Sequence, residues 1–219
     1  MDHTKSSGLK PEARPLPEDP RALIAPADGT LSQFGRIDAG TLMQAKGDRY
    51  PLRSLVLDSR AQTLFDGGWF ATIYLAPADY HRVHVPFDAT LTRSVTVPGE
   101  LFSVNPHTEA AIPLLFCRNE RLVMHFKSDY GPLIVVMVGA LIVASIETVF
   151  DAPASPYRSE ALSAHRQPFT RGEELGRFLL GSTVIVIVPP GEFTPRAELR
   201  PGERIAMGNP LGVFNSARG

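Results

Sequence analysis

The chain has 219 residues, 43% of them hydrophobic, which is enough for one folded domain and excludes a disordered protein. A formal net charge of -1 and an isoelectric point near 6.6 give no electrostatic reason to expect a nucleic-acid partner. The single cysteine, Cys117, excludes an internal disulfide, and without a signal-peptide pattern we expect a reducing, cytoplasmic setting.

The N-terminal residues 1–22 carry four prolines, mixed charges and little apolar content. This composition predicts a flexible tail. The remaining residues, 23–219, are expected to form a single domain.

Short segments rich in strand-forming residues, separated by Gly and Pro, follow the tail. They cover residues 68–76, 81–87, 89–99, 121–126, 132–140, 141–150 and 182–188. The longest apolar run, 133–146, is interrupted by Gly139 and Ala140, and it is too short to span a bilayer. Helices are predicted over 52–65 and, as a short turn, over 172–178. The expected fold is mostly β (α+β), a sandwich or barrel-like β core with a few short helices.

Two histidines, His81 and His84, lie close together in DYHRVHVP. On a strand, His84 shares a face with Arg82, so two ordinary polar-face histidines are the simplest interpretation. A metal site that adds His107 and Glu109 is an alternative, although no spacing in the chain matches a zinc signature.

Other groups are weak signals by themselves. Asp28 before Gly29 and the run 118–121 (Arg-Asn-Glu-Arg) are typical of solvated turns. The Gly181-Ser182 step is typical of a tight turn before a buried strand. Ser182, Asp28 and His84 have the residue types of a catalytic triad, but the chain lacks the G-x-S-x-G sequence of common serine hydrolases.

Taken together, these segments resemble the phosphatidylserine decarboxylase family. The likeness covers most of residues 23–188 and includes APADG, QAKGDRYPL, ATIYLAPADYHRVHVP, LFSVNP, RNERLV, VGALIVASIET and GRFLLGSTVI, in that order. YHRVH and LGST are the most specific of these motifs.

The resemblance implies that the protein cuts its own Gly181–Ser182 bond, giving a large chain (1–181) and a small chain (182–219). Asp28, His84 and Ser182 match the family's charge relay for self-cleavage, and Ser182 would become a covalent pyruvoyl cofactor. This group would form a Schiff base with phosphatidylserine, and His81 matches the residue that transfers a proton during decarboxylation to phosphatidylethanolamine. The resemblance implies no metal and no diffusible cofactor.

The expected partners are the two chains of the same precursor, phosphatidylserine and the cytoplasmic face of the cell membrane, which the protein would contact peripherally. A homo-oligomer is a further alternative that the sequence does not decide. The residues before Asp28 form no convincing amphipathic helix, so contact with lipid would need an apolar patch on the core or an upstream start. Basic residues could also attract anionic lipid, or be solvated surface charge: Lys46, Arg49, Arg118 and Arg121.

Three alternatives remain at this point. The chain could be a pyruvoyl decarboxylase of a soluble amino acid, a non-cleaving β-rich binding module, or a serine hydrolase that uses Asp28, His84 and Ser182 without cutting itself.

Overall fold

The protein is a layered β structure, seen in a computed structural model that describes residues 14–43, 49–140, 146–179, 181–191 and 193–215. The strands are β1 (Ala22–Ile24), β2 (Gly29–Asp38), β3 (Thr41–Met43), β4 (Arg49–Pro51), β5 (Trp69–Leu75), β6 (Arg82–His84), β7 (Ala89–Val97), β8 (Arg121–Ser128), β9 (Gly131–Val138), β10 (Ile146–Thr148), β11 (Ala161–Phe169), β12 (Glu174–Phe178), β13 (Ser182–Val188), β14 (Phe193–Pro195), β15 (Arg204–Ile205) and β16 (Pro210–Phe214). The helices are α1 (Leu52–Val56), α2 (Ala61–Leu64), α3 (Pro106–Ala111) and α4 (Leu115–Arg118).

The large central sheet has the order β11-β7-β8-β9-β13-β5-β2-β3-β4, with β15 added beside β2. Strand β13 lies in its interior, paired antiparallel with β9 on one side and β5 on the other. All of its residues are buried, which explains why the strand is an uninterrupted run of β-branched side chains after Ser182 rather than an alternating sequence.

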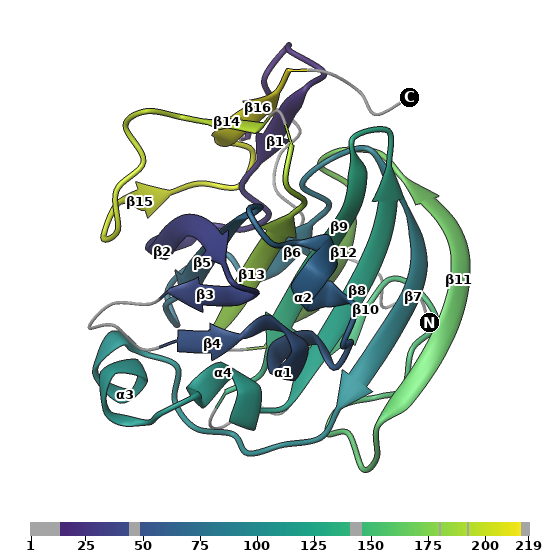
Figure 1. Cartoon of the computed structure of the whole chain (residues 1–219). Coiled ribbons are helices and arrows are strands. Elements are labelled where there is room, and N and C mark those ends of the chain that lie inside the picture. The colour runs from purple at the N-terminus through teal and green to yellow at the C-terminus, as the bar shows by residue number, and fades with distance from the viewer. Residues whose placement is uncertain (1–13, 44–48, 141–145, 180, 192, 216–219) are drawn as a thin grey trace, which may run out of the picture.

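Each face of this sheet has its own hydrophobic core. On one face Val184, Val186 and Val188 pack with residues of two smaller sheets, ordered β1-β16-β14 and β10-β12-β6. On the other face Ile185 and Ile187 pack with residues of α1, α2, α4 and the strands β7–β9. Figure 1 shows β7, β8, β9 and β11 as a curved sheet with α1 and α2 on its concave side.

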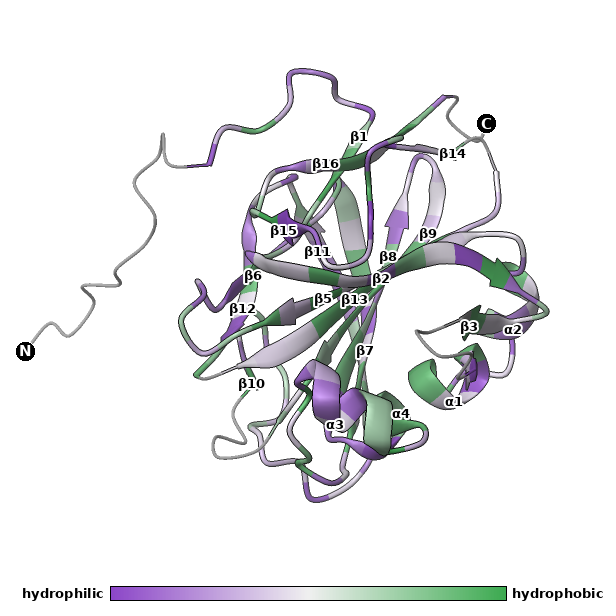
Figure 2. Ribbon diagram, turned by 90° about the vertical axis from the view of Figure 1, so that its left-hand side faces the viewer, coloured by the Kyte–Doolittle hydropathy of each residue, from purple (hydrophilic) through white to green (hydrophobic). Residues whose placement is uncertain are grey.

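The small sheet of β1, β14 and β16 lies at one end of the molecule, and α1, α3 and α4 lie at the other end. Figure 2 shows this arrangement, with the large sheet between them and apolar colouring along its inner strands. The prediction of a mostly β, sandwich-like core with a few short helices is confirmed. Two predicted strands are also confirmed almost to the residue, as β5 and β13, whereas residues 141–145 lie outside the described part of the chain.

The predicted helix over 52–65 is wrong as a single element, because the chain forms α1 and α2 with a break between them. Leu57 ends α1 in the left-handed region, with φ of 51°, and this conformation cannot continue a right-handed helix. The carboxylate of Asp58 then accepts hydrogen bonds from the backbone N–H and the side chain of Arg60, which fixes the turn.

The predicted short helix over 172–178 is also wrong. Gly172 has φ of 88°, and the residues after it form strand β12, which pairs with both β6 and β10. Pairing with the neighbouring strands therefore outweighs the local preference of this segment for a helix.

The prediction of a solvated turn at 118–121 is wrong for three of its four residues, because Asn119, Glu120 and Arg121 are buried. Arg121 is 2% exposed, and its guanidinium donates hydrogen bonds to the carbonyls of Ser54, Leu55, Cys117 and Asn119. It joins α1 to α4 and is not available to attract lipid.

Part of the expected N-terminal tail lies against the domain. Arg171 donates hydrogen bonds to the carbonyls of Pro17, Asp19 and Ala22. Residues 1–13 lie outside the described part of the chain.

Candidate active site

Strand β12 brings together the two motifs that the sequence singled out. It pairs with β6, and the backbone N–H of Phe178 donates to the carbonyl of His81 over 2.9 Å. After Phe178 the chain passes Gly181 and enters β13 at Ser182, which lies opposite Leu75 of β5. The YHRVH and LGST motifs are therefore neighbours in space, although they are far apart in sequence.

The Gly181-Ser182 step is closely packed. A Cβ atom on Gly181 would lie 3.1 Å from the carbonyl oxygen of Leu75 and 3.3 Å from Cδ of Pro77, both tighter than an ordinary contact. Ser182 is 2% exposed. A glycine fits here because a side chain would press against the end of β5 and against Pro77.

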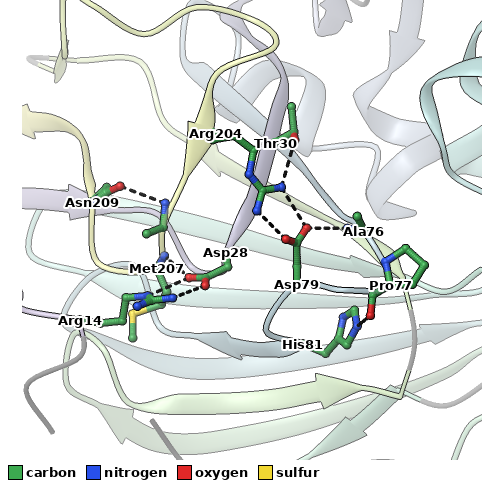
Figure 3. A network of polar contacts seen from close by, with 11 residues as sticks. Arg14, Asp28, Thr30, Ala76, Pro77, Asp79, His81, Arg204, Met207 and Asn209 are labelled. Atoms are coloured by element: carbon green, nitrogen blue, oxygen red, sulfur yellow. Dashed lines mark hydrogen bonds and ion pairs between the residues drawn. The ribbon is translucent and has the colours of Figure 1, made fainter. Parts of the chain in front are cut away.

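His81 lies beside this step through a shared neighbour. Its Nε2 atom is 3.1 Å from the carbonyl oxygen of Pro77, the residue that also packs against Gly181 (Figure 3). A carbonyl only accepts hydrogen bonds, so Nε2 carries the proton, and in the neutral ring Nδ1 is an acceptor. Within the described residues this Nδ1 is buried and has no hydrogen-bond partner.

His84 is held in the opposite tautomer. Its Nδ1 atom donates to the carbonyl of Gly172 over 2.8 Å, which leaves Nε2 of the neutral ring as an acceptor. The hydroxyl of Tyr80 donates to that Nε2 over 3.2 Å, and the two rings are stacked. Burial lowers the pKa of His84, so the ring is neutral at neutral pH.

Asp28 acts on His84 through its charge, since its described hydrogen bonds go elsewhere. Its carboxylate accepts the backbone N–H of Met207 over 2.8 Å and forms a two-point ion pair with Arg14 (Figure 3). Its negative charge nevertheless works to raise the pKa of His84, against the larger effect of burial. The three candidate residues Asp28, His84 and His81 thus line the same region, but Asp28 and His84 are not joined by a hydrogen bond among the described contacts.

A second carboxylate, Asp79, fixes the loop that carries His81. It accepts the backbone N–H of Ala76 over 2.7 Å and pairs with Arg204, which also reaches the hydroxyl of Thr30 (Figure 3). These contacts hold the loop after β5 next to β15. The hydrogen bond with Arg204 lowers the pKa of Asp79, which keeps it ionised.

Sequence reasoning missed the residues that orient the two histidines. Tyr80 is the first residue of YHRVH, and its place in that motif is the one available signal. Gly172, Arg14 and Arg204 come from distant segments, and nothing in the local sequence indicates their contacts.

The remaining candidate residues do not add to this site. Among the described residues no group of three or more His, Cys, Asp or Glu side chains is arranged to hold a metal ion, so the alternative built on His107 and Glu109 has no cluster. Arg49 and Arg118 are exposed, Arg118 over the ring of Phe102, whereas Lys46 lies outside the described part of the chain. In the described residues no helix has the length and apolar character needed to cross a bilayer.

Comparison with known proteins agrees with the motifs. The family described as phosphatidylserine decarboxylase matches residues 6–213. A phosphatidylserine decarboxylase proenzyme of Bordetella avium is 49% identical over 211 residues, covering 91% of this chain and 72% of the relative. Proenzymes of the same description from Pseudomonas entomophila and Alcanivorax borkumensis are 49% and 45% identical, covering 94% and 95% of this chain and 74% of each relative.

Proposed function

Because the chain belongs to the phosphatidylserine decarboxylase family, we propose that it converts phosphatidylserine to phosphatidylethanolamine after cutting its own Gly181–Ser182 bond. Its activity is that of a decarboxylase, a carboxy-lyase. The observation that carries the proposal is the packing of Gly181 against Pro77, which the His81 ring also contacts, at the start of the buried strand β13.

Self-cleavage begins with the hydroxyl of Ser182, which attacks the carbonyl carbon of Gly181 and replaces the amide bond with an ester. Elimination then releases Gly181 with the former serine oxygen as a carboxylate, and hydrolysis of the remaining enamine releases ammonia and leaves a pyruvoyl group at position 182. A glycine before the serine favours the attack, because no side chain shields its carbonyl. The pairing of β13 with β5 and β9 fixes the serine in place.

His84 is suited to take the proton of the Ser182 hydroxyl. A hydroxyl is a poor nucleophile until a base accepts its proton, and the base must be unprotonated beforehand. The lowered pKa of His84 and its hydrogen bond to Gly172 meet this condition, since they leave Nε2 as the free base. Tyr80 occupies Nε2 and must release it as the proton arrives.

The residues at the step also fit a pyruvoyl group. When present, this group supplies the electron sink that decarboxylation needs. The buried, unpartnered Nδ1 of His81 is a polar atom close to this position, in the described part of the chain. Because Nε2 of His81 holds its own proton on Pro77, Nδ1 is the atom that exchanges a proton with the substrate carbon.

Cleavage would not separate the two chains. Every residue of β13 is buried, and the strand is paired on both sides with strands of the larger chain. The small chain 182–219 also supplies β14 and β16, which complete the sheet with β1. We further propose that the assembled enzyme meets its lipid substrate by peripheral contact with the cytoplasmic face of the membrane.

Intact mass spectrometry of the purified, denatured protein tests the cleavage. The expected result is two species, one ending at Gly181 and one beginning with a pyruvoyl group in place of Ser182. Ser182→Ala should remain a single chain of the full 23.9 kDa, whereas Ser163→Ala on the edge strand β11 should split like the unmodified protein. A split Ser182→Ala protein would show that the cleavage chemistry is wrong.

Incubation with phosphatidylserine or with free serine tests the substrate. Release of carbon dioxide from phosphatidylserine alone supports the proposal. Release from serine alone would assign a soluble amino acid as the substrate instead. A protein that remains one uncut chain and releases carbon dioxide from neither substrate would support a binding module.

A further inference from the structure

A pocket of about 740 Å³ lies at the other end of the large sheet from Ser182. It is bounded by α2, by β7 and by the hairpin of β8 and β9 (Figure 1). In β9, Val138 pairs with Thr183 near the candidate active site, whereas Pro132 at the opposite end lines the pocket. At the usual rise of a strand the two ends are about 20 Å apart, so the pocket is separate from the site of cleavage.

Basic side chains meet on one face of the sheet at this pocket. Arg93 of β7 and His125 of β8 are directly opposite each other in the strand register. Lys127 follows two residues after His125, and because side chains alternate along a strand, it lies on the same face. All three residues line the pocket.

His125 presents a buried donor without a partner. A guanidinium nitrogen of Arg93 is 3.3 Å from Nδ1 of His125, and a guanidinium has only donors, so Nδ1 accepts and the neutral ring carries its proton on Nε2. This Nε2 has no hydrogen-bond partner within the described residues, and His125 is 9% exposed. A buried N–H without an acceptor is costly, so it indicates a group that the pocket receives.

The local charge also favours an anion. Asp58 pairs with both Arg60 and Arg93, and these hydrogen bonds hold its pKa well below the usual range. One carboxylate therefore balances two arginines. Lys127 and Asp129 add one charge of each sign, which leaves the lining with an excess positive charge.

The rest of the pocket sets the kind of ligand. Its volume falls in the range of small-molecule sites. Leu64, which is 50% exposed, and the buried Phe65 also line the pocket, so its lining combines apolar surface with the basic groups. The imidazole N–H, the guanidinium and the ammonium are all donors, which matches a phosphate oxyanion with several acceptor oxygens.

We propose that this pocket is an accessory binding site for a phosphate group, with Arg93, His125 and Lys127 as its donors. The phosphate can belong to a soluble phosphate ester or to the headgroup of an anionic phospholipid, and the two sources are distinguished below. The site does not depend on the chemistry proposed for Ser182.

Thermal unfolding of the full chain in inorganic phosphate and in glycerol phosphate, at constant ionic strength, tests the site. Binding to the folded state alone raises the melting temperature in a saturable way. Lys127→Gln should weaken phosphate binding about tenfold, equivalent to ~1.4 kcal/mol. His125→Phe, which removes the N–H and fills space, should abolish the shift. Arg93 is left unchanged because its loss would leave Asp58 poorly paired and could unfold the chain.

The control is Arg166→Gln, which removes one positive charge from the exposed edge strand β11 and should bind phosphate like the unmodified protein. Co-sedimentation with phosphatidylcholine vesicles, with and without phosphatidylglycerol, identifies the source. Pocket-dependent binding to the phosphatidylglycerol vesicles assigns a lipid headgroup, and its absence together with a phosphate shift assigns a soluble ester. The proposal is overturned by the lack of a saturable shift, by a shift that both pocket variants retain, or by an equal shift in acetate.

Discussion

The carboxylate of Asp28 acts on two basic groups, the guanidinium of Arg14 and the ring of His84. It pairs with Arg14, and it also acts to raise the pKa of His84, where burial has the larger, lowering effect. Removing the positive charge that neutralises Asp28 should therefore raise the pKa of His84 and make it a stronger base. Self-cleavage should report this balance, because it needs His84 to accept a proton.

We expect Asp28→Asn to slow self-cleavage about tenfold, the effect of a change of one pKa unit in the base. Arg14→Gln should accelerate it, because the charge of Asp28 is then less compensated. The measurement is the rate at which the small chain 182–219 appears after cell-free synthesis. If both variants slow cleavage, Asp28 acts by holding Met207 and the segment around Arg14 in place and not through its charge.

We expect His84 to act in self-cleavage and His81 to act in decarboxylation. We expect His84→Ala to remain an uncut chain, because the base that activates Ser182 is lost. His81→Ala should cut itself, since His81 is held by Pro77 and is not needed as the base, but it should lose turnover of phosphatidylserine. Mass spectrometry reports the first step and release of carbon dioxide the second. Normal turnover by the His81→Ala variant would show that His81 does not transfer the proton.

The candidate site could be predicted only in part from the sequence. Motifs identified His81, His84 and the Gly181-Ser182 step, because these residues are local and specific. They could not show that Gly172 and Tyr80 orient His84, because the contact with Gly172 depends on how β12 pairs with β6.

At the scale of elements, the break between α1 and α2 has a local cause that can be tested. Leu57 adopts a left-handed conformation that is unfavourable for a residue with a Cβ atom, and it is 40% exposed, so its side chain contributes little packing. Leu57→Gly should stabilise the protein by about 1 kcal/mol and raise the melting temperature by ~2–4 °C.

The matched control for this prediction is Leu64→Gly in α2, an exposed leucine in a regular helical conformation. It should lower stability by about 1 kcal/mol, because glycine is less favourable than leucine in a right-handed helical conformation. Thermal unfolding in the Ser182→Ala background keeps the chain in one piece for both variants. Destabilisation by Leu57→Gly would mean that the leucine side chain, and not its backbone, governs this turn.

The elements themselves were predictable where burial and pattern agree. The run 183–188 consists of β-branched residues only, which is typical of a strand buried on both faces, so its sequence predicted β13 clearly. Strand β11 was missed because its sequence lacks a regular pattern: it is an edge strand whose outer residues face solvent. The helix expected at 172–178 failed because the positive φ of Gly172 and the pairing with β6 are not visible in composition.

At the scale of the whole molecule, a buried histidine and a half-buried glutamate make the free energy of unfolding depend on pH. Burial, together with the charge of Arg93, lowers the pKa of His125 to about 4, and burial raises the pKa of Glu109 to about 7. The two groups act in opposite directions. As the pH falls, His125 is protonated in the unfolded chain first, which lowers the free energy of unfolding. As the pH rises from 4.5 toward 7, Glu109 ionises in the unfolded chain first, which also lowers the free energy of unfolding.

For His125 the sign follows from the lowered pKa in the folded state. At pH above about 6.5 both the folded and the unfolded chain hold it neutral, and its contribution to stability is complete. As the pH falls, only the unfolded chain binds the proton, so the free energy of unfolding decreases by about 1.4 kcal/mol per pH unit and by on the order of 3 kcal/mol at pH 4. The charged groups that face the ring are Arg93, Asp58 and Arg60, and the hydrogen bonds of Asp58 hold its pKa well below this range.

Denaturant unfolding at pH 7.5, 6 and 5 in the Ser182→Ala background measures this dependence. His125→Phe should remove the loss of stability below pH 6.5, so that stability rises as the pH falls toward 5. Glu109→Gln should raise stability at pH 7.5 and steepen the loss in acid, because the opposing effect of Glu109 is removed. The comparison separates the two groups because the two variants change the slope between pH 5 and 6.5 in opposite directions. If His125→Phe retains the full acid slope, then His84 or the carboxylates carry it, and the ring of His125 is less isolated from water than its burial and unpartnered Nε2 indicate.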